Sequence, residues 1–306
     1  MHGIRSPPSL EEVNTLMDKT LFNASFDESK TLSPNLFSKN RPFYYDLGIS
    51  DSEKLSRRLF LVIPWFFLGG ISYGLGIGFP ETVGMTKGDL KWIVYGGQYF
   101  IFLRPLILVI LLIIGITIFL NFFPKKNYMV QRMFGILNLL FLIILLDFSL
   151  MPMLLGATLG ATGWLGFTLI CVYGLSFFFS CMASRINGIK QELYKKSIDE
   201  QSSYISKIWA FLKKIWLVPF ALLLINIFTV RLGMWGSFTL WSFVWMLAGP
   251  IYFGILTLLS VGPMKMFVSS FYFAKYAEQY RVLWRVTDEQ WYGKRKAKRI
   301  AKKKLK

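Results

Sequence analysis

The chain has 306 residues, of which 54% are hydrophobic and only 17% are charged, and its formal net charge at pH 7 is +18. Soluble domains carry about 25% charged residues, so this composition excludes an ordinary soluble globular protein. The apolar residues gather into runs of the roughly 20 residues that a helix needs to cross a bilayer. The composition therefore predicts an all-α, polytopic membrane protein.

The charged and apolar residues divide the chain into three parts. Residues 1–58 hold eight basic and eight acidic side chains and no apolar core of signal-peptide type. Within them Ser9 and Glu12 fit a capping box, which predicts a short amphipathic helix. We expect a polar cytoplasmic segment over 1–58 and a transmembrane bundle over 59–262. An interfacial amphipathic helix with a basic cytoplasmic tail should follow over 263–306.

Six apolar runs predict six transmembrane helices. In chain order they are roughly Leu59–Phe79, Tyr99–Phe122, Met133–Leu155, Gly160–Ala183, Ile215–Trp235 and Phe238–Val261. Lys and Arg gather in alternate connections: seven lie between 185 and 214 and thirteen follow residue 262, whereas the connection after the third run has none. Basic loops stay in the cytoplasm, so the pattern predicts a cell-membrane protein with both termini inside.

Glycines mark two helix faces on which another backbone could approach closely. Gly70, Gly74 and Gly78 recur at four-residue spacing in the first run, and Gly156 and Gly160 form a second patch. Small residues at this spacing are typical of helix–helix contacts in membranes. Packing within one bundle is the preferred interpretation, and a seam between copies of a homo-oligomer is the alternative.

Arg104 and Asp147 are the clearest charges inside the predicted spans. Charges in hydrocarbon are costly and mostly face the bundle interior. Measured from the connection that both helices share, their heights differ by about 7 Å, so a structural Arg104–Asp147 ion pair is expected. The alternative is a proton or cation site at Asp147, with Asn138 and Asn226 extending a polar route.

The last fourteen residues hold nine Lys and Arg. Attraction to anionic lipid is the simplest explanation, at about 1 kcal/mol per basic residue near the surface. Nucleic acid would need similar charge, but no recognisable module accompanies it. A match of Lys303 and Lys304 to a dilysine retrieval signal is expected by chance in so basic a tail. The residues assigned to headgroup contact are Lys294, Arg295, Lys296, Lys298, Arg299, Lys302, Lys303 and Lys304.

Signatures of catalysis, metal binding and cofactor binding are missing from the sequence. His2 is the only histidine, so an H-E-x-x-H zinc helix is excluded, and no phosphate-binding loop occurs. The letters G-x-S-x-G surround Ser72, but no histidine base follows it. Cys171 and Cys181 lie ten residues apart in one predicted helix, too far for a disulfide. We expect neither an enzyme nor a metal or cofactor site.

Several short strings stand out within about residues 40–130. They are Phe43-Tyr44-Tyr45-Asp46-Leu47, Ile63-Pro64-Trp65, Gly96-Gly97, Phe102-Leu103-Arg104-Pro105-Leu106 and Pro124-Lys125-Lys126-Asn127. Together they resemble the tandem five-transmembrane proteins of Gram-positive bacteria. The chain departs from that family in its sixth span, long polar head and basic tail. Some relatives are thought to act as immunity proteins against membrane-damaging toxins, and the resemblance implies that role here.

The expected function is that of a non-enzymatic integral membrane protein acting through helix–helix or protein–protein contacts. Self-protection against a membrane-active toxin is its most concrete form. The alternative is a transporter or permease component with a polar route near Asp147 and Arg104. The expected partners are anionic lipids and either a toxin or a permease subunit, with a second copy of the chain as the alternative.

Overall fold

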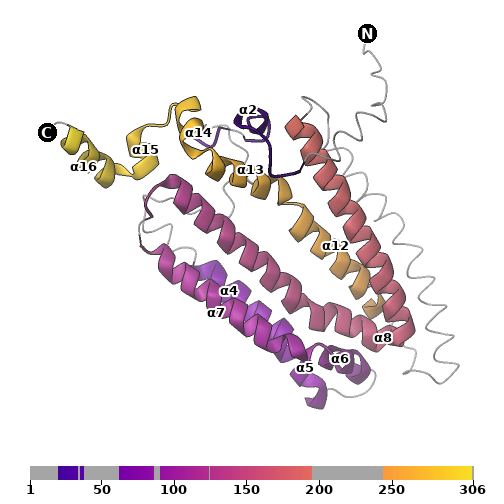
Figure 1. Ribbon diagram of the computed structural model, residues 1–306. Helices are drawn as coiled ribbons and strands as arrows, with labels where there is room; N and C mark the ends of the chain where they lie inside the picture. Colours follow the sequence, from indigo (N-terminus) through magenta and orange to yellow (C-terminus); the bar gives the residue numbers. More distant parts are fainter. Residues whose placement is uncertain are drawn as a thin grey trace, which may run out of the picture.

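The computed structural model describes residues 20–33, 35–37, 62–85, 90–123, 125–194 and 244–304. Across these ranges the regular elements are all helices, with no strand (Figure 1). Three of the described helical segments are long and apolar enough to cross a membrane: Ile101–Asn121, Tyr128–Tyr194 and Val244–Lys275. This confirms an all-helical chain with membrane-spanning capacity. The helix expected after Ser9 and the fifth predicted span lie outside the described residues.

The first apolar run is helical but interrupted. It forms α4 (Val62–Tyr73), a π-helical segment η2 (Gly74–Gly78) and α5 (Phe79–Glu81). Alternate glycines in η2 have low helix propensity, so the regular α-helical register is weakly held there. The π-helical segment also rotates the residues around it relative to an unbroken helix.

A set of short elements leads into the next long helix. The 3-10 segment η3 (Thr82–Met85) is followed by α6 (Leu90–Gln98), η4 (Ile101–Leu103) and α7 (Arg104–Asn121). Pro105 lies in the first turn of α7, where proline is tolerated because the missing N–H would have no helical partner.

The third and fourth predicted spans are two arms of α8 (Tyr128–Tyr194), which reverses direction at Gly163 (Figure 1). Gly163 has φ 67° and ψ 179°, a conformation that glycine adopts without the steric cost that a side chain would bring. The connection between the third and fourth spans was expected between Leu155 and Gly160, but the chain reverses a few residues later, at Gly163. Residues 156–160 are helical and free to make backbone contacts.

The last described range, 244–304, contains α12 (Ala248–Val261) and α13 (Met264–Lys275), which run in the same general direction (Figure 1). They are followed by α14 (Ala277–Leu283), α15 (Asp288–Tyr292) and α16 (Lys294–Lys304). The single amphipathic helix expected after residue 263 is thus four helices. Positive φ angles at Arg285 and Gly293 end the helices that precede them.

The described amino-terminal residues lie against this carboxyl-terminal part. Residues 20–33 and 35–37, with α2 (Phe26–Ser29), cross α13 and α14 at one end of the bundle (Figure 1). Leu36 joins Phe273, Tyr280 and Trp291 in a buried cluster, which we call the terminal aromatic cluster. An interfacial helix was expected over 263–306, but these three aromatic rings are buried inside the protein because Leu36 and Ile136 pack against them.

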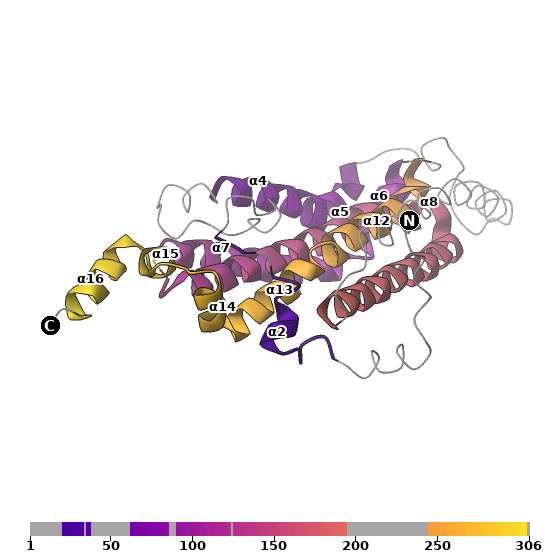
Figure 2. The ribbon, with the colours of Figure 1, turned by 90° about the horizontal axis from the view of Figure 1, so that it is seen from above.

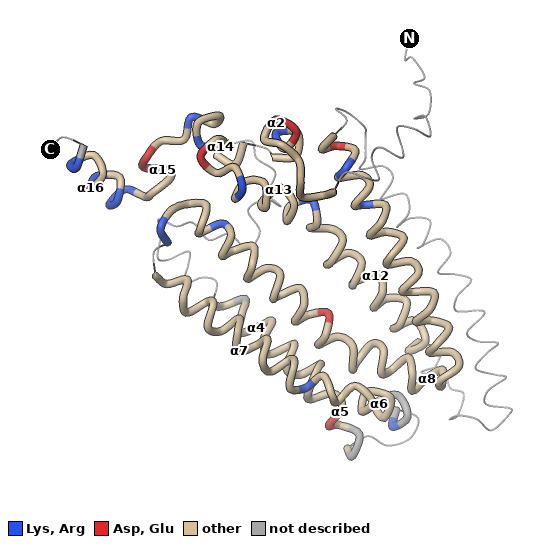
Figure 3. Tube along the Cα trace, viewed as in Figure 1, with Lys and Arg blue, Asp and Glu red and all other residues tan. Residues whose placement is uncertain are grey.

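The long helices are arranged in layers. Seen from above, α4 lies on one side and the second arm of α8 on the other, with α7, the first arm of α8 and α12 between them (Figure 2). Charged residues gather at the two ends of these helices, and their middle portions are almost uncharged (Figure 3). This distribution suits elements that lie side by side in hydrocarbon.

Candidate functional site

Asp147 lies midway along the first arm of α8 and is 8% exposed. The Ser260 hydroxyl of α12 donates a hydrogen bond to its Oδ2 at 3.2 Å. The Tyr252 hydroxyl of the same helix donates to the main-chain oxygen of Asp147 at 3.4 Å. Among the described residues, Oδ1 of Asp147 has no hydrogen-bond partner. The carboxyl group is therefore buried and only partly satisfied.

Arg104 does not reach this carboxyl group. Its Nη1 lies 2.8 Å from Oε1 of Glu81, and the two side chains are 43% and 50% exposed. The expected Arg104–Asp147 pair is therefore wrong. Helical rise gives the height of a residue but not the direction in which it faces, and the start of α7 faces the end of α5. Glu81 was missed because it was treated as part of a polar connection.

The other polar candidates do not join Asp147. Asn138 lies nine residues earlier on the same arm, about 14 Å away along the helix axis, and its Oδ1 is buried with no described partner. Asn226 lies outside the described residues. The buried hydroxyls of Ser72 and Ser149 also have no described partner. The letters G-x-S-x-G drew attention to Ser72, whereas no sequence pattern pointed to Ser149.

The first run packs through a different glycine face from the one expected. A Cβ added at Gly76 would lie 2.6 Å from Ile107 Cδ1 and 3.2 Å from Ser149 Cα, so this glycine contacts both α7 and α8. By contrast, a Cβ at Gly70 or Gly74 would meet nothing within 4 Å, and one at Gly78 would meet only the Tyr73 oxygen of its own helix at 4.0 Å. Among the described residues, the Gly70, Gly74 and Gly78 face therefore has no close helix contact, and its packing within the bundle stays a prediction.

The second glycine patch does make a close helix–helix contact. A Cβ at Gly156 would lie 2.5 Å from Gly97 Cα, and one at Gly96 would lie 2.6 Å from Gly160 N. The backbones of α6 and α8 therefore touch, as small residues at a membrane-helix contact allow. The prediction for Gly156 and Gly160 is confirmed, with Gly96 and Gly97 as the partners.

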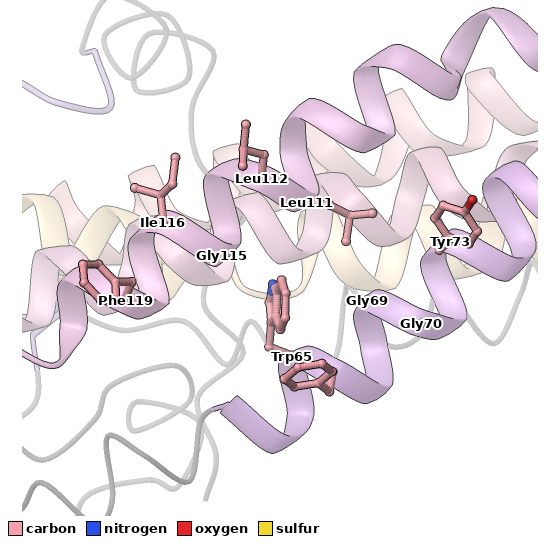
Figure 4. Close-up of a pocket in the computed structure, with 10 residues that line it drawn as sticks. Trp65, Gly69, Gly70, Tyr73, Leu111, Leu112, Gly115, Ile116 and Phe119 are labelled. Atoms are coloured by element: carbon pink, nitrogen blue, oxygen red, sulfur yellow. The ribbon is translucent and has the colours of Figure 1, made fainter.

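An open apolar groove of about 680 Å³ lies between α4 and α7 (Figure 4). Glycines from both helices line it, Gly69 and Gly70 from α4 and Gly115 from α7. The remaining lining residues are aromatic or aliphatic: Trp65, Phe66, Tyr73, Leu111, Leu112, Ile116 and Phe119. The unpacked face of Gly70 thus forms part of the groove.

The basic residues of α16 are exposed wherever their side chains are described. Lys296 donates a hydrogen bond from Nζ to the Lys126 carbonyl oxygen at 2.8 Å. This contact joins α16 to the connection between α7 and α8, so two basic segments lie side by side. The other described basic side chains of the helix are exposed and present a dense positive charge.

Neither a protein-family model, nor a curated protein, nor a solved structure matches the chain. The likeness to tandem five-transmembrane proteins therefore stays a prediction.

Proposed function

We propose that the chain is a six-span protein of the cell membrane with both termini in the cytoplasm. Its three long apolar segments support this arrangement, since the reversal at Gly163 divides one of them into two arms. The described amino-terminal residues and helices α13–α16 also lie at the same end of the bundle (Figure 1). The basic α16 belongs to that end, as expected for a cytoplasmic face.

We further propose that the protein is not an enzyme and acts by binding an apolar helix of a partner protein. The observation that carries this proposal is the open groove between α4 and α7, with glycine on both walls and exposed Phe66 and Phe119 beside them. The lining offers few polar groups, so a polar solute would lose its hydration without gaining hydrogen bonds there.

The nature of the groove favours a helix over a lipid chain as the occupant. In a bilayer, lipid tails are as apolar as leucine, so helices associate through close packing and small residues rather than through hydrophobicity alone. The chain already uses this mode where Gly96 and Gly97 meet Gly156. Gly70 and Gly74 present the same kind of surface, and no described residue lies within 4 Å of a Cβ added at either glycine.

Self-protection against a membrane-active helical peptide is the most concrete form of this function. A peptide held in the groove would be removed from the membrane area that it damages. The resemblance of residues 40–130 to a family with immunity proteins agrees with this proposal, and the groove lies largely within that part of the chain.

Expression of the full chain in a bacterium sensitive to pore-forming helical peptides tests the proposal. The cells are tested against a panel of such peptides. For at least one peptide, expression of the chain should raise the peptide concentration that is needed to depolarise the cells. Gly70→Leu fills the groove and should remove the protection. Gly254→Leu is the matched control, since Gly254 in α12 also has nothing within 4 Å of an added Cβ.

Cross-linking identifies the occupant. A photoreactive residue at Ile116, which lines the groove and is exposed, should form an adduct with the peptide against which the chain protects. Adducts with lipid alone, or equal protection by the Gly70→Leu and Gly254→Leu variants at equal membrane levels, would contradict a helix-binding groove. Protection against none of the peptides would contradict the self-protection role.

A transporter or permease component is the second candidate, favoured by the buried and partly satisfied carboxyl group of Asp147. Intramembrane carboxyl groups mark proton and ion pathways in many transporters. This function predicts solute or proton flux in liposomes that contain the purified chain. Asp147→Ala should abolish the flux, and Glu81→Gln, outside the buried region, should leave it unchanged.

A further inference from the structure

Asp147 is isolated as a charge-bearing side chain in the bundle. It is the only Asp, Glu, Lys or Arg between Met133 and Ser184. The ion pairs of the described residues do not include it, and Arg104 is already engaged by Glu81. Its one described side-chain hydrogen bond comes from the neutral hydroxyl of Ser260. No described cation compensates a charge at this position.

The elements around this part of α8 present neutral groups. From α12, Ser260 and Tyr252 contact Asp147. From the second arm of α8, the titratable Cys171 packs in the same apolar cluster as Tyr252. The sequence has no Asp, Glu, Lys or Arg from 62 to 80, from 105 to 121 or from 248 to 261. The titratable group of α4, Tyr73, is exposed. Every described group that faces the carboxyl is therefore uncharged at neutral pH.

The ligands available suit a proton rather than a metal ion. Hard cations such as Ca²⁺ take about six to eight oxygen ligands. The described residues contain no group of three or more His, Cys, Asp or Glu side chains that could hold a metal. The Tyr252 hydroxyl already donates to a main-chain oxygen. A proton needs only one carboxylate oxygen, and Oδ1 is the oxygen without a described partner.

We propose that Asp147 is a proton-binding site coupled to the contact between α8 and α12. Its Oδ1 carries a proton while α12 lies against α8, because a neutral acid is far less costly to bury than an unpaired carboxylate. When the two helices separate and water enters, the O–H bond breaks and the proton passes to water. Proton binding and helix contact thus favour each other, by the reciprocity of coupled equilibria. The proposal does not rest on the function of the groove.

Infrared difference spectroscopy of the full chain in lipid nanodiscs tests the protonation directly. At neutral pH an exposed aspartate, with a pKa of about 4, is ionised. The wild-type protein should nevertheless show the C=O stretching band of a protonated carboxyl group, and Asp147→Asn should lose it. Ser260→Ala should keep the band but shift it, because one hydrogen bond to the carboxyl group is lost. A carboxylate signal from Asp147 at neutral pH would overturn the proposal.

Thermal unfolding in the same nanodiscs tests the coupling. A group that is neutral in the folded state and ionised in the unfolded state makes the folded state lose stability as the pH rises. The wild-type midpoint should therefore fall with rising pH, and that of Asp147→Asn should stay level because the amide copies the neutral acid. A midpoint of Asp147→Asn well below wild type at neutral pH would overturn the proposal. If sodium raised the unfolding midpoint of the wild type alone, that result would overturn the proposal in favour of a cation site.

Discussion

The hydroxyl of Tyr272 accepts a hydrogen bond from the backbone N–H of Ala24 at 3.0 Å, across 248 residues of sequence. The same hydroxyl donates to the Leu21 carbonyl oxygen at 2.9 Å. One turn later Tyr276 donates to the Ala24 carbonyl oxygen at 2.8 Å. A further turn on, the Tyr280 and Ser29 hydroxyls lie 2.7 Å apart, and burial raises the pKa of Tyr280, which keeps its phenol neutral. Three tyrosines at four-residue spacing, one in α13, one at the break after it and one in α14, thus hold the amino-terminal residues in place.

Replacing Tyr272 by Phe should loosen residues 20–37. The ring remains, but the Ala24 N–H and the Leu21 carbonyl lose their partner, at a cost of about 1–3 kcal/mol for buried groups left unsatisfied. Hydrogen exchange of residues 20–37 should accelerate accordingly, because local opening becomes easier. Tyr73→Phe, in an exposed tyrosine of α4, is the control. Unchanged exchange in Tyr272→Phe would mean that these hydrogen bonds do not hold the segment.

Adding a single methyl group at Gly156 should destabilise the contact between α6 and α8. The new Cβ would lie 2.5 Å from Gly97 Cα and 2.7 Å from Gly97 N, so one backbone has to move. Overpacking of this kind costs about 1–3 kcal/mol. The midpoint of unfolding should fall for Gly156→Ala and stay near wild type for Gly254→Ala, whose Cβ enters open space. Equal midpoints for the two variants would contradict the close backbone contact.

Arg104 and Asp147 should be energetically independent. Arg104 pairs with Glu81 in a half-exposed position, where ion pairs contribute about 0–1 kcal/mol. A double-mutant cycle with Arg104→Gln and Asp147→Asn should give an interaction energy near zero, within the roughly 0.3–0.5 kcal/mol expected of separate sites. The cycle of Arg104→Gln with Glu81→Gln is the comparison. If Arg104 were coupled more strongly to Asp147 than to Glu81, the ion pair expected from the sequence would be correct.

Thiol labelling of intact cells should distinguish the two faces of the protein. In a chain with Cys171 and Cys181 replaced by Ala, a cysteine at Met85, which is 85% exposed, should react with a membrane-impermeant reagent. A cysteine at Ala301 in α16 should react only after the cells are opened. Labelling of Ala301→Cys from outside would invert the proposed topology, and labelling of both positions would place the two ends of the bundle on one side.

The basic helix α16 should respond to lipid charge. A fluorophore on Ala301→Cys should report a less polar environment in nanodiscs with anionic lipid than in zwitterionic ones, and added salt should reverse the difference. Replacing Lys298 and Arg299 by Gln should weaken the response, at about 1 kcal/mol per basic residue near the surface. A signal independent of lipid charge would contradict headgroup contact.

The sequence alone determined the class of this protein and the helix face that carries Gly156 and Gly160. Apolar runs too long and too uncharged for a soluble domain leave helices as the structure that satisfies the backbone in hydrocarbon. Small residues at four-residue spacing correctly marked Gly156 and Gly160, because backbone approach depends only on what projects from the helix itself. These features are local, so composition and spacing reveal them.

The tertiary structure alone decided which groups meet. Arg104 pairs with Glu81 and not with Asp147. The first run contacts its neighbours through Gly76 and not through Gly70. Aromatic rings after Pro263 pack inside the protein, in a cluster that includes Leu36. Each outcome depends on how one helix is rotated about its axis relative to another, and on where the chain reverses. Helical periodicity gives the height of a residue, but its partner is set by the packing of segments that are distant in the sequence.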